Sequence, residues 1–381
     1  MGRRRTFSAK KVRVRLASAI VAVAFSLTSV ALAAPAASAS PSAVSASDPS
    51  YLKADINELL KSVTNSELIG TSWWQAAVAQ STLEAYQQTT GNQDEEILAT
   101  FTFQYYKSGK FEDNFDDDTA WWALVWLQYY DITHGSEFLQ MAETDANYIH
   151  QDWSGACGGG VWWQRSPEYY KNAIANELFL ELTAWLHNSI KGDTKYLSWA
   201  KAEWNWFSHT GMITKSYLVT DGLSAAADKG KNCVNTSPSN NKKIWTYNQG
   251  VILAGLAQLY KATGNKSYLT EAKHIASAAI SNLTVKGVLT ERCKQNGCGN
   301  GSQSFKGIFV RDLKVLAVTA KTTAYNSFFT KQASSIRTKD TNSHNQLGMF
   351  WAGPPGPKAD LTSWSQASAI DALVAALDLP K

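Results

Sequence analysis

The chain has little cysteine and little proline for its length, with 4 Cys and 9 Pro among 381 residues. Four cysteines are too few to be the main scaffold of a fold this long, which excludes the small disulfide-framed proteins. With 44% hydrophobic and 18% charged residues, a collagen and an intrinsically disordered chain are excluded as well. The composition can bury a full core, either in one large domain or in two ordinary ones.

Acidic residues are absent before Asp48, whereas seven Lys and Arg residues lie within the first 15 positions. An apolar run from about Leu16 to Ala33 follows, and then the small-residue sequence Ala37-Ser38-Ala39. This order is typical of a secretory signal peptide, so we expect residues 1–39 to be one and residues 40–50 to be a disordered start of the mature chain. A retained anchor helix is the alternative, because the apolar run is nearly long enough to span a bilayer.

The same segment dominates the net charge. The whole chain carries +4, but residues 1–39 hold seven basic and no acidic residues, so the remainder carries −3. A nucleic-acid-binding domain normally has a surplus of Lys and Arg. We therefore expect no nucleic-acid partner, and no membrane contact after the signal peptide is cleaved.

Export would place the four cysteines where disulfides form. Cys293 and Cys298 bracket a short polar loop, and Cys157 and Cys233 both lie in loops rich in Gly or Asn. Two disulfides with these pairings are expected, although spacing alone leaves the connectivity open. The cysteines form no CxxC pair and the six His form no HExxH motif, so we expect no metal site.

From Tyr51 onward the hydrophobic spacing is helical, and no β-alternation extends beyond a few residues. A repeated unit places an aromatic residue, a Leu and an Ala after a glycine, at Gly192 and Gly264 and, shifted by one residue, at Gly135. Each copy follows an apolar helix, so the unit is a helix, a glycine-capped turn and a second helix. Such hairpins must stack to bury their apolar faces.

The remaining length suits twelve helices. Residues 50–381 would give each helix and its loop about 28 residues, which is ordinary for both. We expect an all-α fold in which six hairpins close into a toroid, with an open solenoid as the alternative. No Pro/Ser-rich linker follows residue 50, which favours a single domain over residues 51–381.

Three consecutive acids, Asp116, Asp117 and Asp118, precede an aromatic helix. The ordinary interpretation is electrostatic, because acids in a first helical turn satisfy free N–H groups and complement the helix dipole. A calcium loop is less favoured, since the spaced D-x-D-x-D-G pattern is missing. The catalytic interpretation is a pair of carboxyl groups about 5 Å apart, one charged and one protonated, as in retaining glycoside hydrolysis.

Tryptophan is abundant, with 15 in the chain and doublets at 73–74, 121–122 and 162–163. Many must fill the core, but Trp162 and Trp163 follow a run of three glycines in a loop, which suggests rings that stack on sugars. Two polar runs enter helices further on. The first run contains Asn172, and the second contains Tyr247, Asn248 and Gln249. These polar side chains are either helix caps or substrate contacts.

These residues resemble a known family. Asp117-Asp118-Thr-Ala-Trp121-Trp122-Ala-Leu124 resembles the D-D-x-x-W-W-(A/G)-L signature of glycoside hydrolase family 76, the endo-α-1,6-mannanases. The likeness covers about Ser72 to Leu377 and includes four further motifs in family order: Gly158–Trp163, Lys171–Asn176, Trp245–Gly250 and Phe305–Arg311. The resemblance implies an (α/α)6 barrel, the toroid of six helical hairpins that the helix arithmetic suggests.

The resemblance also implies chemical roles. Asp117 would be the nucleophile that forms a mannosyl ester, and Asp118 would be the general acid and base. Asp116 leaves an alternative open, because aligning the family motif one residue earlier would make Asp116 and Asp117 the catalytic pair. Thr119 stands where the family often has Asn or Gln, so an amide role there is in doubt. The substrate contacts expected are Trp162, Trp163, Asn172, Tyr247, Asn248 and Gln249.

The sequence therefore predicts a secreted, extracellular, retaining endo-α-1,6-mannanase that uses no cofactor and no metal. Its partner would be the polysaccharide α-1,6-mannan, and a monomer is the default expectation. A cell-wall transglycosylase of the same family is the first alternative, and a non-catalytic mannan-binding protein is the second. Another (α/α)6 enzyme, such as an epimerase or a lyase, would use a catalytic His, or Tyr with Arg. Such residues occur in the sequence, but no motif groups them as a catalytic set.

Overall fold

The computed structural model describes residues 49–64, 72–93, 96–167, 169–225, 233–235, 243–291, 299, 301–356 and 361–381. The predicted signal peptide and the Cys293–Cys298 pair lie outside these residues. Twelve α-helices make up most of the described chain: α1 (Pro49–Thr64), α3 (Trp73–Thr90), α4 (Glu96–Tyr106), α5 (Asp116–Thr133), α6 (Ser136–His150), α7 (Ala173–Ser189), α8 (Lys195–Phe207), α9 (Thr246–Thr263), α10 (Lys266–Asn282), α11 (Ser302–Thr319), α12 (Asn326–Lys339) and α13 (Ser363–Leu377).

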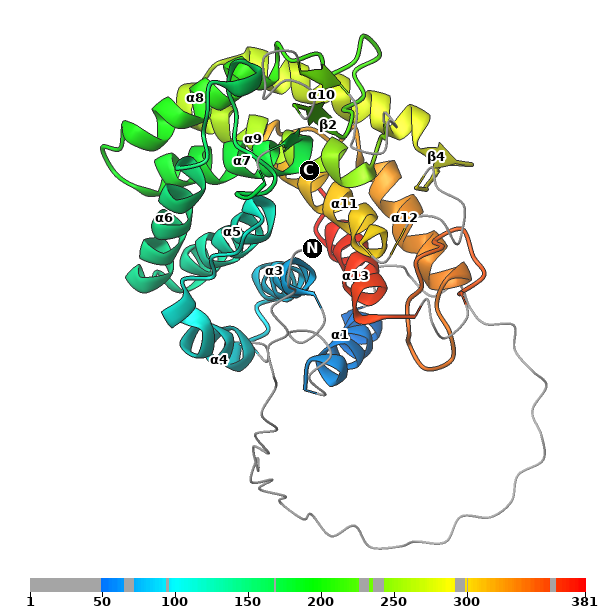
Figure 1. Cartoon of the computed structure of the whole chain (residues 1–381). Coiled ribbons are helices and arrows are strands. Elements are labelled where there is room, and N and C mark those ends of the chain that lie inside the picture. Colours follow the sequence, from blue (N-terminus) through cyan, green and yellow to red (C-terminus); the bar gives the residue numbers. More distant parts are fainter. Residues whose placement is uncertain are drawn as a thin grey trace, which may run out of the picture. The chain divides into compact units, whose positions relative to one another are not determined.

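The helices form two concentric rings (Figure 1). Helices α3, α5, α7, α9, α11 and α13 each pack against the next, and α13 packs against α3, so the inner ring is closed. The other six helices alternate with them along the chain and lie outside. The predicted toroid of six helical hairpins is therefore confirmed, and the open solenoid is excluded because its ends would not meet.

Burial distinguishes the two rings. Every residue of inner helix α9 from Asn248 to Leu259 is buried, because this helix contacts neighbours on all sides. Outer helix α6 buries one stripe, Phe138, Ala142, Ala146 and Ile149, at the spacing of a single helical face.

Two glycines let inner helices approach closely. A Cβ atom at Gly250 would lie 2.6 Å from the Cα atom of Phe309, and one at Gly307 would lie 2.5 Å from the Cα atom of Ser368. Glycine is therefore required where α9 meets α11 and where α11 meets α13.

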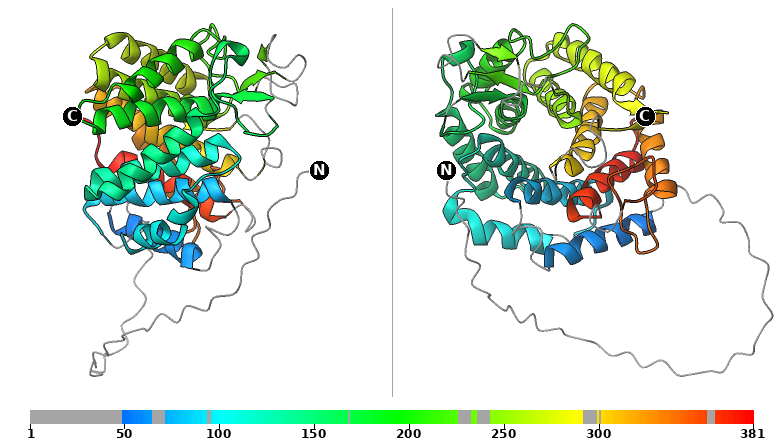
Figure 2. Two further views of the ribbon diagram at one scale, coloured as in Figure 1. Left: turned by 60° about the vertical axis from the view of Figure 1, so that its left-hand side comes forward. Right: turned by 45° about the vertical axis from the view of Figure 1, so that its right-hand side comes forward.

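The inner helices run in the same direction, since an antiparallel outer helix returns the chain before each new inner helix (Figure 2). All their N-termini consequently lie at one end of the barrel. The loops that connect outer helices to the following inner ones also reach this end. Short strands form there: β1 (Tyr170–Asn172), β2 (Gly222–Ser224) and β3 (Val234–Asn235) make an antiparallel sheet, and β4 (Thr284–Val285) pairs with β5 (Val288–Leu289).

Amide side chains on inner helices fasten these loops. Asn176 accepts a hydrogen bond from the N–H of Val161 (2.8 Å) and donates to its carbonyl (3.1 Å). Gln249 makes the same pair of bonds to Val219, at 2.8 and 2.9 Å. Each loop residue is completely buried, so its backbone groups need these partners in place of water.

The predicted glycine-containing turns are present, but glycine caps the preceding helix in only one of the three copies. After α7, Ile190 is the C-cap in an extended conformation, and Gly192 has the positive φ of 80° two residues further on. Gly264 caps α9 in the left-handed conformation, with φ 71°. In the shifted copy, His134 takes the left-handed position (φ 58°) and Gly135 follows it as the N-cap of α6.

A disulfide joins Cys157 to Cys233, as expected, and links the loop before β1 to strand β3. None of the helices in the described part of the chain is long and apolar enough to cross a membrane.

Replacing both Cys157 and Cys233 by alanine should lower the free energy of unfolding by about 2–4 kcal/mol, because the bond closes a long loop in the unfolded chain. The sequence separation of 76 residues makes this loop large. Chemical denaturation of the double variant and the wild type measures the difference. An unchanged unfolding midpoint would contradict a stabilising role.

Candidate active site

The three consecutive aspartates form the first turn of α5, at the end of the barrel where the inner N-termini gather. The preceding residue, Phe115, is the N-cap and makes no capping bond through its side chain. The partial positive charge of a helix N-terminus favours carboxylates at this position. The three side chains nevertheless have different surroundings.

Asp116 is completely buried and points toward a loop. One of its carboxyl oxygens lies 3.4 Å from Arg165, which also pairs with Asp152 at 3.1 Å. Burial, and then the charge and hydrogen bond of Asp152, raise the pKa of Asp116 to about 10. Asp116 is therefore a neutral group that fastens α5 to the loop.

Asp117 accepts several hydrogen bonds. Its Oδ2 atom accepts from the indole Nε1 of Trp163 at 3.0 Å, and its Oδ1 atom accepts from the backbone N–H of Asp118 at 3.1 Å. Asn172 adds a side-chain hydrogen bond. Burial raises the pKa of Asp117 to about 7, and these bonds oppose the rise because they stabilise the charged form. The side chain stays partly exposed to solvent.

Asp118 is also partly exposed, and its pKa is raised well above the usual range. Burial is the main cause, and the negative charges of Asp117 and Asp113 follow. Two adjacent carboxyl groups that raise each other's proton affinity take up protons unequally. The hydrogen bonds favour the charge on Asp117 and the proton on Asp118.

Three of the six predicted substrate contacts lie beside this pair. Trp163 and Asn172 hydrogen-bond Asp117. Tyr247 is close enough that the charge of Asp117 contributes to raising the pKa of the tyrosine, after burial and the charge of Asp221. Its ring stacks on Phe305, with 3.8 Å between the centroids.

The other three predicted substrate contacts are buried side chains. Trp162 is only 4% exposed, and the ammonium of Lys171 lies 4.6 Å from its ring centroid. Asn248 and Gln249 are completely buried in α9, and Gln249 is occupied by the backbone of Val219. Trp162 and Gln249 thus have partners other than Asp117 and Asp118, whereas neither amide atom of Asn248 has a hydrogen-bond partner among the described residues.

Further polar groups near the pair were missed by the sequence analysis. The hydroxyl of Tyr170 donates to Asp221 at 2.9 Å, and Trp245 makes a side-chain hydrogen bond to the same carboxylate. Burial raises the pKa of Asp221, which remains partly exposed. Tyr170 and Trp245 adjoin or belong to polar motifs, but Asp221 is a single acid in a long loop and carries no local signal.

Aromatic rings continue from this cluster across the inner helices. Trp245 meets Phe305 edge-on, with 5.6 Å between the centroids. Trp74 contacts both Phe305 and Trp121, with 6.2 Å between the centroids in each case. Trp74 and Trp245 are partly exposed and can offer ring faces to a ligand.

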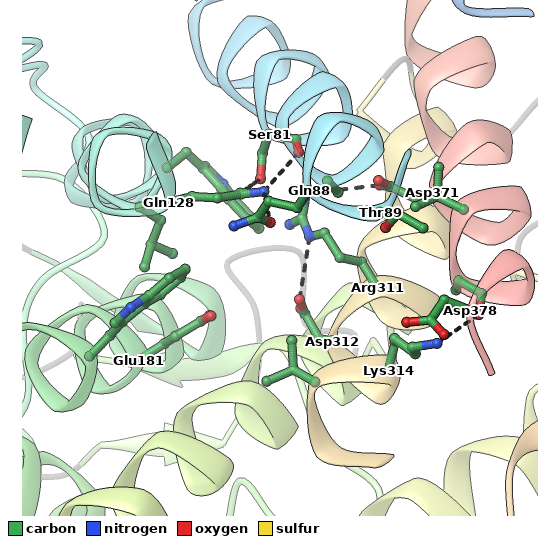
Figure 3. A pocket seen from close by; sticks show the side chains of 17 residues that line it. Ser81, Gln88, Thr89, Gln128, Glu181, Arg311, Asp312, Lys314, Asp371 and Asp378 are labelled. Carbon is green, nitrogen blue, oxygen red and sulfur yellow. Dashed lines mark hydrogen bonds and ion pairs between the residues drawn. The ribbon is translucent and has the colours of Figure 1, made fainter. Parts of the chain in front are cut away.

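A separate cavity of about 210 Å³, with both charged and apolar side chains in its lining, lies among residues drawn mostly from the C-terminal halves of the inner helices (Figure 3). Arg311 is its central cation, 3.5 Å from Asp312 and 3.9 Å from Asp371. Because Asp117 and Asp118 begin α5, this cavity and the aspartate pair belong to different parts of the barrel. Among the described residues, no group of three or more His, Cys, Asp or Glu side chains could hold a metal ion.

Residues 46–379 match the family described as Glycosyl hydrolase family 76, and the chain belongs to that family. It is 29% identical to the mannan endo-1,6-alpha-mannosidase DCW1 of Candida albicans over 65% of this chain and 58% of that protein. Its identity to DFG5 of the same organism is 27%, over 63% and 57% of the two chains. The chain thus spans less than two thirds of these curated relatives.

Solved structures show the same fold. The GH76A alpha-1,6-mannanase from Salegentibacter sp. HEL1_6 superposes with a TM-score of 0.72 at 25% identity, over 86% of this chain and 98% of that one. An inactive variant of that enzyme, with two consecutive aspartates replaced by alanine, binds alpha-1,6-mannotetrose. It superposes with a TM-score of 0.70 at 25% identity, over 80% and 89% of the two chains.

The stability of this protein should fall as the pH rises from about 5 to about 8. Burial raises the pKa of Asp117 and Asp340 to about 7 and that of Asp371 to about 6, all above the unfolded value of 3.8. Between the two values the folded chain binds more protons than the unfolded chain, so raising the pH favours unfolding.

Thermal unfolding at several pH values at constant ionic strength measures this effect. A melting temperature that rises steadily over the same range would contradict it.

Proposed function

We propose that this protein is a retaining endo-α-1,6-mannanase in which Asp117 and Asp118 perform the chemistry. The observation that carries the proposal is their unequal environment: Asp117 accepts hydrogen bonds that favour its charge, whereas burial and its neighbour favour the proton on Asp118. A charged nucleophile beside a protonated acid is the ground state that a double displacement needs. Family membership and the mannotetrose-bound relative support the substrate class.

In the first step, an oxygen of Asp117 attacks the anomeric carbon and forms a mannosyl ester, while Asp118 protonates the departing glycosidic oxygen. In the second step, Asp118 removes a proton from water, which attacks the same carbon and releases Asp117. Two inversions give net retention. Trp163 and Asn172 hold Asp117 during both steps through the hydrogen bonds described above.

The substrate would lie against the aromatic and polar groups near the pair. Tyr247, Trp245 and Trp74 offer ring faces suited to stacking on mannose. Asp221 accepts hydrogen bonds from Tyr170 and Trp245, and it can also accept hydrogen bonds from sugar hydroxyls. Trp162 and Gln249 are assigned to the support of the loops, because they are buried against Lys171 and Val219.

We also propose that the protein acts outside the cell. The N-terminal segment has the order of a signal peptide, and the Cys157–Cys233 disulfide suits an oxidising compartment. Fractionation of the producing cells, with N-terminal sequencing of the mature protein, tests export and the cleavage position together.

Asp117→Asn and Asp118→Asn should each reduce turnover of α-1,6-mannan by at least about 100-fold while the fold is kept. Each substitution removes one group on which a step depends. Asp116→Asn is the matched control, because its carboxyl is already neutral and should tolerate an amide. Steady-state rates on unbranched mannan, with circular dichroism for the fold, measure the three effects. Near-wild-type turnover by either of the first two variants would remove that residue from the mechanism.

The product anomer and product length test the reaction type. Incubation with unbranched α-1,6-mannan should release a ladder of short oligosaccharides whose first-formed anomer is α, because two displacements retain configuration. Proton NMR during the first minutes identifies the anomer, and chromatography gives the lengths. A β anomer would contradict double displacement, and products longer than the starting chains would identify a transglycosylase.

A further inference from the structure

Lys171 is a completely buried lysine in strand β1, directly before helix α7. Its ammonium lies within hydrogen-bonding distance of five oxygens that all belong to one loop. These are the carbonyl and hydroxyl oxygens of Ser154 (both 3.1 Å) and the carbonyls of Ala156 (2.8 Å), Gly159 (2.5 Å) and Gly160 (2.7 Å). An ammonium has only three N–H donors, so it cannot donate a separate hydrogen bond to each of the five oxygens. The oxygens instead surround the positive charge, as carbonyl ligands surround a metal ion.

The backbone of the loop is shaped to make this cage. Gly158, Gly159 and Gly160 all have positive φ, at 84°, 149° and 82°. A Cβ atom at Gly159 or Gly160 would lie 2.7 or 2.4 Å from the ring of Trp206 on α8. Several carbonyl dipoles that converge on one point repel one another unless a cation lies between them.

A buried carboxyl group and two aromatic rings also lie near the ammonium. Glu203 on α8 is completely buried, and burial raises its pKa well above the usual range, while the positive charge of Lys171 opposes this rise. The rings of Trp162 and Trp206 face the ammonium at 4.6 and 5.7 Å. Trp206 additionally donates from Nε1 to the carbonyl of Cys157 at 2.9 Å.

The cage connects directly to Asp117 through the residues on either side of Lys171. The preceding residue, Tyr170, accepts the backbone N–H of Trp163 at 2.8 Å, and Trp163 in turn accepts the N–H of Asp116 at 3.1 Å. The following residue is Asn172, whose side chain hydrogen-bonds Asp117. Both side chains that donate to Asp117 are thus attached to the segment that Lys171 anchors.

We propose that Lys171 is a positioning residue whose ammonium acts as a fixed internal cation. It folds the 154–160 loop around itself and thereby holds the indole of Trp163 and the amide of Asn172 on the Asp117 carboxylate. Its importance for turnover rests on the proposed function, but its effect on the ionisation of Asp117 does not. The titratable groups that face Asp117 are Asp116 and Asp118 on α5 and Tyr247 on α9, and none of them is altered by the tests below.

Lys171→Met keeps the length of the side chain and removes the charge. The loop should loosen, and Trp163 should lose its alignment with Asp117. We expect kcat on α-1,6-mannan to fall about 10- to 100-fold with little change in KM, because the reacting carboxylate is misplaced while the substrate surface remains. The acidic limb of the kcat/KM profile should move to higher pH by about one unit, since Asp117 loses a donor that favours its charge.

Two further variants separate this role from a loss of stability. Trp163→Phe removes the indole donor while it keeps an aromatic ring, and it should move the acidic limb in the same direction. Lys306→Met removes another buried ammonium, one that donates to the carbonyl of Met349 and faces Trp351 at 4.5 Å. It should lower the melting temperature without moving the acidic limb, because Lys306 is not part of the loop that carries Trp163.

The indole N–H resonance of Trp163 gives a readout that needs no substrate. In ¹⁵N-labelled protein, its chemical shift should titrate with Asp117, and Trp163→Phe identifies the signal by its loss. Lys171→Met should raise the midpoint. An inactive wild type with this titration intact would refute the proposed function and leave the role of Lys171 standing.

A folded Lys171→Met variant with the wild-type midpoint and kcat would overturn the role of Lys171. If that variant does not fold, a Trp163→Phe variant with an unmoved acidic limb would overturn it equally, since the proposed route passes through this indole.

Discussion

The parallel direction of the six inner helices determines where chemistry can occur in this barrel. Each inner helix begins at the same end, so the partial positive charges of their N-termini face one region. The first turn of α5 brings three carboxyl groups into that region. Burial there would keep all of them protonated, and only a carboxyl group with several donors can hold a charge near neutral pH. Asp117 is the one so supplied, by Trp163, Asn172 and the N–H of Asp118.

The donors come from segments far apart in the chain, and their alignment depends on the loop before α7. The disulfide to Cys233, the amide of Asn176 and the ammonium of Lys171 all hold this loop. Each uses a different interaction, covalent, hydrogen-bonded and ionic, on a backbone that glycines allow to turn sharply. Catalytic groups on loops need such support, because a loop without regular hydrogen bonding does not keep side chains aligned.

Neighbouring residues of similar type have different roles because the backbone turns between them. Trp162 and Trp163 follow one another in the loop before β1, and their side chains have different partners. Trp163 meets Asp117, and Trp162 faces the ammonium of Lys171. On α9, Tyr247 lies beside Asp117, whereas the side chain of Gln249 turns to the backbone of Val219. Residue type marked each of these positions as polar or aromatic without showing which way it faces.

The sequence by itself determined the twelve helices, their pairing into hairpins and the position of the aspartate motif, whereas the connectivity of the disulfide needed the structure. Helical periodicity and turn residues are local, and local signals can be read along the chain. Tertiary structure alone decided that Asp116 pairs with Arg165 rather than joining the other two acids, and that Asp221 and Asp117 both act electrostatically on Tyr247. It also decided that Lys171 is surrounded by carbonyls. These outcomes depend on burial and on contacts between distant segments, which set the charge of each group and leave no trace in the local pattern.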